Sequence, residues 1–295
     1  MADLGLVVAD LVVGLMLGCV FAVIAHGLNV IWGVTKVVNV AHGEFIMLGA
    51  YGAYYLNVYL GFNPVLSVPV DAAIGIGVGF LFYFGLLHRE LRGKEAITRE
   101  SEMVTLVATF GLSLVISNAA LAIFKGDAVG IRWAPETLDL GPFDVALGGL
   151  YVAISSVAII AISDLFLSRT YLGNAIRAYS QDIGAAQLMG INPARIAAIA
   201  TAIGFALTMA GGALLTVWLP VGITPLIGAT YAPISFVIVV LGGPGKMWGS
   251  LLGGLTLGIL IDVLPAFGIS ASIAVAVAFL VLIPVLLFAR EGILR

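Results

Sequence analysis

Three polar residues interrupt an apolar stretch near the start of the chain: Asn39, His42 and Glu44. Ionisable groups at membrane depth are costly, by about 2.5–3.5 kcal/mol for Asp, Lys or Arg at a helix centre. One interpretation is a polar lining or gate on a solute pathway, with a helix break at Gly43 that turns His42 and Glu44 into one cavity. The alternative is local: Asn39 and Glu44 satisfy backbone groups that the break leaves unpaired.

A stripe of hydroxyl groups follows further along the chain. Four residues are spaced four apart and share one helix face: Thr105, Thr109, Ser113 and Ser117. These hydroxyls could line a polar path, and Thr105, Thr109 and Ser113 therefore join Asn39, His42 and Glu44 as candidate pathway residues. The favoured alternative is that they join helices through interhelical or backbone hydrogen bonds.

Residues 168–195 form the longest polar segment between apolar stretches. Four apolar residues recur there at helical spacing: Ile176, Tyr179, Ile183 and Ala186. Three polar residues fall on another face: Asn174, Arg177 and Gln181. Gly190 and Pro193 are typical of a helix end. The pattern predicts one short amphipathic helix over 174–189, which either lies in the membrane interface or docks into a partner's groove.

Other chemistry is excluded by what the sequence lacks. The single cysteine, Cys19, rules out a disulfide framework or a thiolate cage. The three histidines show no metal-binding spacing, and we expect no metal site and no catalytic residue. The run GGPGK ends like a phosphate-binding loop, but Val240 and Met247 replace the required Gly and Ser or Thr. We therefore expect no ATP binding by this chain. A net charge of −3 without a basic cluster argues against nucleic acid as a partner.

The elements that position these residues follow from composition. The chain has 295 residues, of which 61% are hydrophobic and 10% are charged, whereas a soluble domain is roughly 25% charged. Its mean hydropathy is +1.16. These values predict an all-α, polytopic membrane protein in contact with lipid. The N-terminal stretch carries Asp3 and Asp10 and no Lys or Arg, which indicates a retained first helix rather than a signal peptide.

Eight or nine transmembrane helices are expected, some of them broken or re-entrant, in a single membrane domain over 1–295. The apolar stretches cover residues 4–25, 28–59, 64–87, 103–124, 145–167, 196–219, 220–241, 247–263 and 269–289. The second is too long for one span and contains the polar cluster, so we expect a break between Val37 and Glu44. Pro220, Pro225 and Pro233 interrupt the seventh. Gly14/Gly18 and Gly254/Gly258 are among the small-residue pairs that favour close helix packing.

Orientation follows from the distribution of Lys and Arg. Residues 88–102 carry four and residues 168–195 carry three, whereas residues 125–144 carry two. Lys246, Arg290 and Arg295 add to the first group. The positive-inside rule then places the N-terminus outside and the C-terminus in the cytoplasm.

Four blocks resemble one known family, the branched-chain amino acid permeases of ABC importers. They cover residues 27–51, which contain the run NVAHGE, and residues 105–114, 177–192 and 239–258. The resemblance is closer to the LivH-type subunit than to its LivM-type sister, and urea and short-amide permeases are built from the same blocks. It identifies 168–195 as a cytoplasmic coupling segment, with these candidate ATPase-coupling residues: Arg177, Tyr179, Gln181, Asp182, Ile183 and Gly190.

The resemblance implies a non-enzymatic transport subunit of the bacterial-type inner membrane. The implied partners are a second permease (LivM-type or a homologous copy), two cytoplasmic ATPase subunits that bind ATP and Mg, and a periplasmic substrate-binding protein. The implied solute is a branched-chain or other amino acid. The rivals are a urea or short-amide permease, an ion-coupled secondary transporter, and a channel or scaffold. An ion-coupled transporter would need acidic sites, for which four residues are candidates, the last three near expected span ends: Glu44, Asp71, Asp164 and Asp262.

Overall fold

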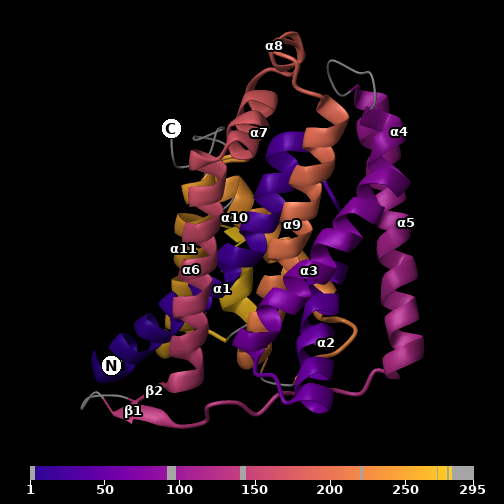
Figure 1. Ribbon diagram of the computed structural model, residues 1–295. Coiled ribbons are helices and arrows are strands. Elements are labelled where there is room, and N and C mark those ends of the chain that lie inside the picture. Colours follow the sequence, from indigo (N-terminus) through magenta and orange to yellow (C-terminus); the bar gives the residue numbers. More distant parts are fainter. Residues whose placement is uncertain are drawn as a thin grey trace.

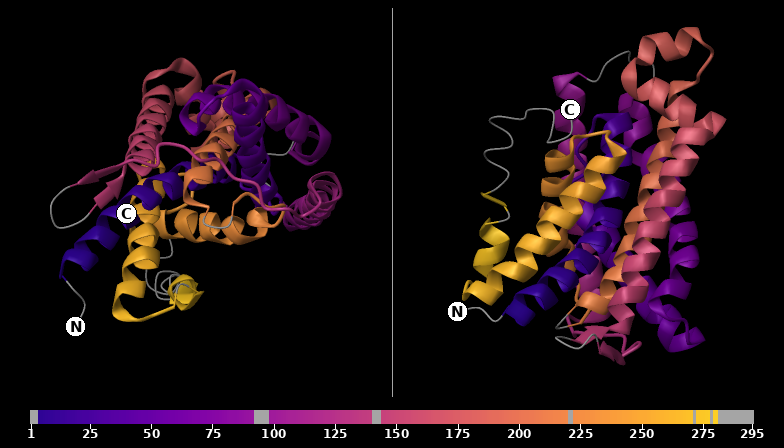
Figure 2. Two further views of the ribbon diagram at one scale, coloured as in Figure 1. Left: turned by 90° about the horizontal axis from the view of Figure 1, so that it is seen from below. Right: turned by 90° about the vertical axis from the view of Figure 1, so that its left-hand side faces the viewer.

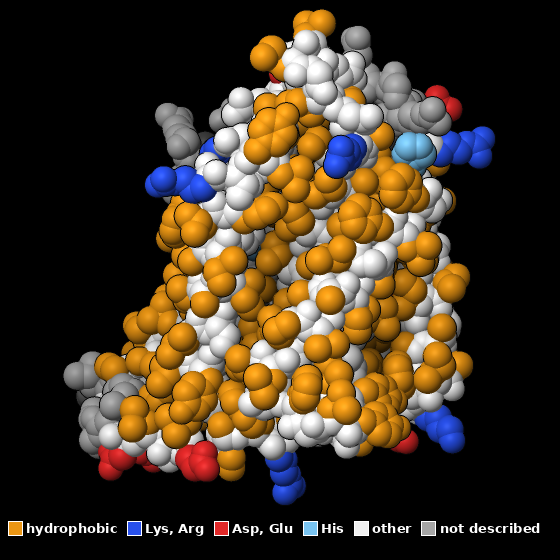
Figure 3. All heavy atoms as spheres, in the orientation of Figure 1, with side chains coloured by type: hydrophobic (Ala, Val, Ile, Leu, Met, Phe, Trp, Pro, Cys, Tyr) orange, Lys and Arg blue, Asp and Glu red, His pale blue; other side chains and the backbone are white. Residues whose placement is uncertain are grey.

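The computed structural model describes residues 4–91, 98–139, 144–219, 222–270, 272–277 and 279–280. The described part is a bundle of helices that run between two ends of the molecule, with one short hairpin at one end (Figure 1). Figure 3 shows a broad apolar band between the two ends, where charged side chains gather. This is the distribution that a membrane-spanning bundle requires.

The helices are α1 Leu4–Thr35, α2 His42–Leu60, α3 Pro64–Phe82, α4 His88–Leu91, α5 Arg99–Phe124, α6 Leu147–Arg169, α7 Tyr171–Gln181, α8 Ile183–Leu188, α9 Pro193–Leu215, α10 Ile227–Gly242 and α11 Met247–Val263. A π-helical turn, Tyr83–Leu87, joins α3 to α4, and 3₁₀ turns follow α9 (Thr216–Trp218) and α11 (Leu264–Phe267). Strands β1 (Thr137–Asp139) and β2 (Asp144–Ala146) pair antiparallel, with Leu138 opposite Val145. The all-α expectation did not include this hairpin.

Six helical segments of the described chain are long and apolar enough to cross a membrane. Three of them are α5, α6 and most of α1. The other three are α3 together with the π-helical turn and α4, α9 together with its 3₁₀ turn, and most of α11 together with its 3₁₀ turn. Helix α10 is apolar but shorter, and α2 has 19 residues. The expected last span, 269–289, lies mostly outside the described residues, so the predicted total of eight or nine is tested only up to that point.

Helix α1 is the central element, and it runs through the point where the first span was expected to end. The boundary predicted at Ala25 is wrong, because no helix-ending feature stands there: Gly27 packs against Gly204 and Thr208 of α9 within one continuous helix. Side chains of α1 lie at the centre of the largest apolar cluster, among them Val20, Ile24 and Leu28.

Small residues bring α1 and α11 together; their spacing predicted close helix packing but not which helices would pair. A Cβ atom at Gly18 would lie 2.8 Å from the Gly254 carbonyl oxygen, and one at Gly14 would lie 2.9 Å from that of Gly258. Figure 2 shows the two helices side by side. The glycine pairs thus allow backbone-to-backbone packing, which is the main attractive force between helices in lipid.

The predicted helix break is confirmed, although its position differs in detail. Helix α1 ends at Thr35, Lys36 takes a positive φ of 55°, and α2 begins at His42. The break therefore covers residues 36–41. Gly43 was the expected break point, but it lies in the first turn of α2, where it contacts Gly228 of α10.

Pro233 does not interrupt the seventh apolar stretch as expected, because α10 continues through it. Proline removes one helical hydrogen bond, which would otherwise reach the carbonyl of Ala229. Ala229 is exposed and lines an open pocket. A carbonyl in such a place can be satisfied by water or ligand, which is how membrane helices tolerate proline.

The chain segments rich in Lys and Arg gather at one end of the bundle. Helices α4, α7 and α8 lie together there, and the β-hairpin lies at the opposite end (Figure 1). Lys246 lies at the same end as α7, because Asn29 of α1 bonds its carbonyl and lines a pocket with Arg177. This grouping is the one on which the positive-inside argument depends.

Candidate functional site

Two of the candidate pathway residues form a direct contact. The Ser113 hydroxyl on α5 donates a hydrogen bond of 2.9 Å to Oε1 of Glu44 in the first turn of α2. Glu44 is 5% exposed, and its Oε2 atom has no hydrogen-bond partner among the described residues. A buried carboxylate oxygen without a donor carries a large desolvation cost unless a ligand completes it.

The rest of the hydroxyl stripe supports the break between α1 and α2. Thr109 Oγ1 accepts a 3.3 Å hydrogen bond from the backbone N–H of Val40 and donates to the Leu106 carbonyl. Thr105 donates to the Ser101 carbonyl within its own helix. Thr105 and Thr109 are both buried; Thr105 bonds only within α5, Thr109 ties α5 to the break at Val40, and Ser113 opens towards a pocket.

That pocket is open to one side and has a volume of about 460 Å³. Glu44 and Ser113 are its polar side chains, and Val40 and Gly43 line it beside them. The opposite wall comes from α10 and is apolar, with Pro233, Phe236, Val237 and Val240. Sequence reasoning missed this wall, because the prolines around α10 were interpreted as interruptions rather than as the edge of a binding surface.

Asn39 and His42 do not line this pocket. Asn39 Oδ1 accepts a hydrogen bond from the Ala41 N–H inside the break, which is the local role that the sequence left open. His42 is buried beside the backbone of Ile24 in α1. The structure thus brings Glu44, Ser113, Thr109 and the break together, but it places the Asn39 and His42 side chains elsewhere.

The segment 168–195 forms two helices instead of the single helix expected over 174–189. Asp182 adopts an extended backbone and caps α8, where its Oδ1 accepts a 2.9 Å hydrogen bond from the Ala185 N–H. An Asp that bonds the backbone three residues ahead starts a new helix. Gly190 has a φ of +81° and follows α8, as the helix-end prediction required.

The apolar stripe of this segment is buried against the chain itself. Ile176, Tyr179 and Ala186 pack with Val30 and Val34 of α1 and with other residues of α6 and α9. Tyr179 is 4% exposed, and burial raises the pKa of its phenol. Tyr179, a candidate ATPase-coupling residue, is therefore not exposed to a partner, because the stripe is buried by the membrane bundle of the same chain.

The exposed side of the segment is at its tip. Leu188 is 91% exposed and Met189 is 82% exposed, at the end of α8 that projects from the bundle (Figure 1). Arg177, Gln181 and Asp182 are also exposed, while Ile183 is half-buried. Arg177 donates hydrogen bonds to the Ser168 carbonyl and to Asn174 Oδ1, which holds it against the start of the segment.

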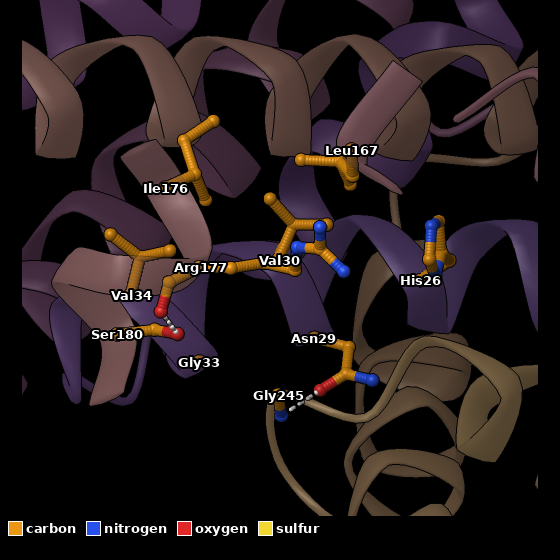
Figure 4. Close-up of a pocket in the computed structure, with 10 residues that line it drawn as sticks. All are labelled: His26, Asn29, Val30, Gly33, Val34, Leu167, Ile176, Arg177, Ser180 and Gly245. Carbon is orange, nitrogen blue, oxygen red and sulfur yellow. Dashed lines mark hydrogen bonds between the residues drawn. The ribbon is translucent and has the colours of Figure 1, made fainter. Parts of the chain in front are cut away.

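Beneath α7 lies a small cavity that joins it to the bundle (Figure 4). Ile176, Arg177 and Ser180 of α7 line it, opposite His26 and Asn29 of α1. Asn29 accepts a hydrogen bond from the Gly245 N–H and donates to the Lys246 carbonyl at 2.7 Å and to Ser250 Oγ at 2.8 Å. Helix α7, helix α1 and the loop before α11 therefore meet at one joint.

The sequence matches the family described as the permease component of branched-chain amino acid transport systems, over residues 11–286. The chain belongs to this family.

Individual relatives agree along almost the whole length. The chain is 32% identical to the high-affinity branched-chain amino acid transport system permease protein BraD of Pseudomonas aeruginosa, over 97% of this chain and 94% of BraD. It is 28% identical to LivH of Salmonella typhimurium, over 95% and 93%. The match to the permease protein LivM of the same organism is 24% identical and covers 81% of this chain but only 60% of LivM.

As a permease component, the chain is a transport subunit and not itself an enzyme. Among its described residues, no group of three His, Cys, Asp or Glu side chains is placed to hold a metal ion. The acidic residues weighed for an ion-coupled permease differ in burial. Asp71 is fully buried as the eighth residue of α3, not near a span end as expected, whereas Asp164 and Asp262 are half-buried.

Proposed function

We propose that this chain is one permease subunit of an ABC importer that moves amino acids, most simply branched-chain ones, across the inner membrane. Family membership over residues 11–286 supports this proposal, as do relatives whose names give branched-chain amino acid transport. A second permease of LivM type, or a copy of this chain, completes the pathway. Two cytoplasmic ATPase subunits bind ATP and Mg, and a periplasmic protein delivers the substrate.

The observation that carries the coupling part of the proposal is the exposed tip of α8. Two large apolar side chains, Leu188 and Met189, project from the same end of the bundle as α4 and α7. Exposed apolar side chains at the end of a rigid helix suit a groove on a partner protein. The tip then transmits ATPase closure through α7 to α1 and to the loop before α11, across the joint beneath α7.

Because the apolar stripe is buried and the α8 tip is exposed, coupling is best tested at the tip. Asp in place of Tyr179 would disrupt the chain's own packing, since Tyr179 is buried, and the loss of transport would not be specific. Leu188→Asp and Met189→Asp change only exposed positions. Burying a Leu or Met side chain contributes about 1.5–3 kcal/mol, so each substitution should weaken ATPase binding at least about tenfold.

The experiment is co-purification of the tagged permease with its ATPase, followed by substrate-stimulated ATP hydrolysis in nanodiscs. The matched control is Leu138→Asp, an exposed apolar residue at the opposite end of the bundle. We expect the tip variants to lose ATPase subunits and the control to retain them. If the wild type brings down no ATPase, the importer proposal fails in favour of an ion-coupled transporter or channel.

The pocket beside Glu44 provides the solute pathway in this proposal. It is open on one side, and the second permease would close it. Orientation follows the Lys and Arg grouping, with α4, α7 and α8 in the cytoplasm and the N-terminus outside. A urea or short-amide permease remains the alternative, and direct binding of solutes to the complex distinguishes the two.

A further inference from the structure

Two helix N-termini meet at the pocket beside Glu44. Helix α2 begins at His42 and α10 at Ile227, and Gly43 and Gly228 in their first turns are in backbone contact. Neither helix has a side-chain cap at its N-terminus, although the backbone N–H groups of His42, Glu44 and Ile227 each bond the carbonyl three residues before. The first backbone N–H groups of a helix lack internal partners and carry the positive end of its dipole. Gly43, Gly228 and Ala229 line the pocket, so both uncapped ends border it.

Glu44 is the second, independent feature of this pocket. Glu44 is only 5% exposed, and it lines the pocket. Ser113 donates to Oε1, while Oε2 is buried and has no partner among the described residues, so a solute reaches it only when the carboxylate turns towards the pocket. An acceptor-only carboxylate oxygen in this position calls for a donor, and an ammonium group is the strongest one available to a small solute.

The third feature is the apolar wall of α10. Phe236, Val237 and Val240 line the pocket in successive turns beyond the N-terminal residues Gly228 and Ala229. A ligand that lies along this wall places its polar end at the helix N-termini and its apolar end against Phe236 and Val240. The pocket volume of about 460 Å³ is in the range of small-molecule sites.

We propose that the permease itself binds a small zwitterion with an apolar side chain at this pocket. Glu44 Oε2 accepts from the solute's ammonium, the N-terminus of α10 takes its carboxylate, and the α10 wall takes its side chain. Because Glu44 lies in the first turn of α2 and offsets the positive end of that helix, α10 is the end that receives the carboxylate. This inference rests on the proposed function, and it names the groups of the permease that select the solute.

Other solute classes match only part of this arrangement. Urea and short amides carry no charge for either the Glu44 carboxylate or the helix ends. A simple cation satisfies Glu44 but leaves the α10 N-terminus unmatched, and a simple anion meets the negative Glu44. Only a solute with both charges and an apolar body uses all three features.

The test measures solute binding to the purified complex in nanodiscs, without the periplasmic protein, by equilibrium dialysis of radiolabelled L-leucine. Competitors are 4-methylpentanoate, which lacks the ammonium, and 3-methylbutylamine, which lacks the carboxylate. For wild type we expect both to compete at least about tenfold more weakly than leucine, since each loses a charge-assisted contact. Glu44→Gln should weaken leucine binding at least about tenfold and strengthen binding of 4-methylpentanoate, whose carboxylate then no longer meets a negative Glu44.

Two further variants keep the result interpretable. Ser113→Ala frees Oε1 without removing the charge, and we expect it to change leucine affinity by less than about fivefold. Glu102→Gln removes an exposed carboxylate at the start of α5 and should have no effect. Assembly of each variant with its partner subunits shows that the permease is folded.

The inference is overturned by no leucine binding to wild type, by equal competition by leucine and 4-methylpentanoate, or by wild-type leucine affinity in Glu44→Gln. Binding of urea or acetamide in place of leucine also overturns it, while the importer proposal stands as long as the ATPase co-purifies. Loss of the ATPase from the wild-type complex is the separate result that counts against the proposed function.

Discussion

Replacing Asn29 by Ala tests the joint between α1, the loop 243–246 and α11. The Asn29 side chain is 2% exposed and makes three hydrogen bonds, one from the Gly245 N–H and two to the Lys246 carbonyl and Ser250 Oγ. Ser250 is fully buried, so its hydroxyl finds no water when Asn29 is lost. At about 0.5–1.5 kcal/mol for each of the three bonds, the variant should lose about 1.5–4.5 kcal/mol of unfolding free energy.

The assay is reversible unfolding in mixed micelles by titration with a denaturing detergent, read by circular dichroism. The matched control is Asn118→Ala, because Asn118 makes a single hydrogen bond to the Leu114 carbonyl on the exposed face of α5. The control should change the unfolding free energy by less than about 0.5 kcal/mol. A value for Asn29→Ala within that same margin would refute the joint as a stabilising element.

A double-mutant cycle separates the contributions. Ser250→Ala alone removes one of the three bonds, so its cost should be part of the Asn29→Ala cost and not add to it. A coupling energy of about 0.5–1.5 kcal/mol is expected for this pair. Fully additive costs would mean that the two side chains do not stabilise each other.

The pH dependence of stability reports on Tyr179. Burial raises the pKa of its phenol in the folded state, so the unfolded chain loses this proton first and stability falls as pH rises above about 10. Tyr179→Phe should abolish that part of the fall when the unfolding free energy is compared at pH 9 and pH 11. An identical loss of stability in wild type and variant would refute this. Orientation is tested by an impermeant maleimide in a Cys19→Ala background. Leu188→Cys should label only from the cytoplasmic side and Glu136→Cys only from outside, and the reverse pattern would invert the topology.

The sequence predicted those features whose causes are local or compositional. The glycine spacing predicted close helix packing, because small residues one helical turn apart let backbones approach in lipid, but it did not predict that α1 and α11 are the partners. The break before α2 followed from excess apolar length with polar residues inside it. The start of α2 at His42, and not after Gly43, depends on Gly43 fitting against Gly228, a contact between residues far apart in the chain.

The pocket could be predicted only in part, for a similar reason. Glu44 and Ser113 were both candidates, yet each was assigned to its own pattern, and nothing local indicates that they bond each other across 69 positions. The apolar wall of α10 was hidden by Pro233, which sequence rules treat as a helix interruption. In a membrane helix beside an open pocket, water can satisfy the freed carbonyl, so a proline need not end the helix.

The coupling segment shows where an amphipathic pattern stops being informative. A stripe of apolar residues indicates that one helix face is buried, but it does not identify the surface that covers this face. Here Tyr179 and Ile176 pack on the helices of their own chain, and this fixes α7 to the bundle. The proposed coupling role needs such attachment on one side and an exposed contact on the other, for which Leu188 and Met189 are the candidates. The burial of the stripe is therefore the reason that movement at the α8 tip would reach α1.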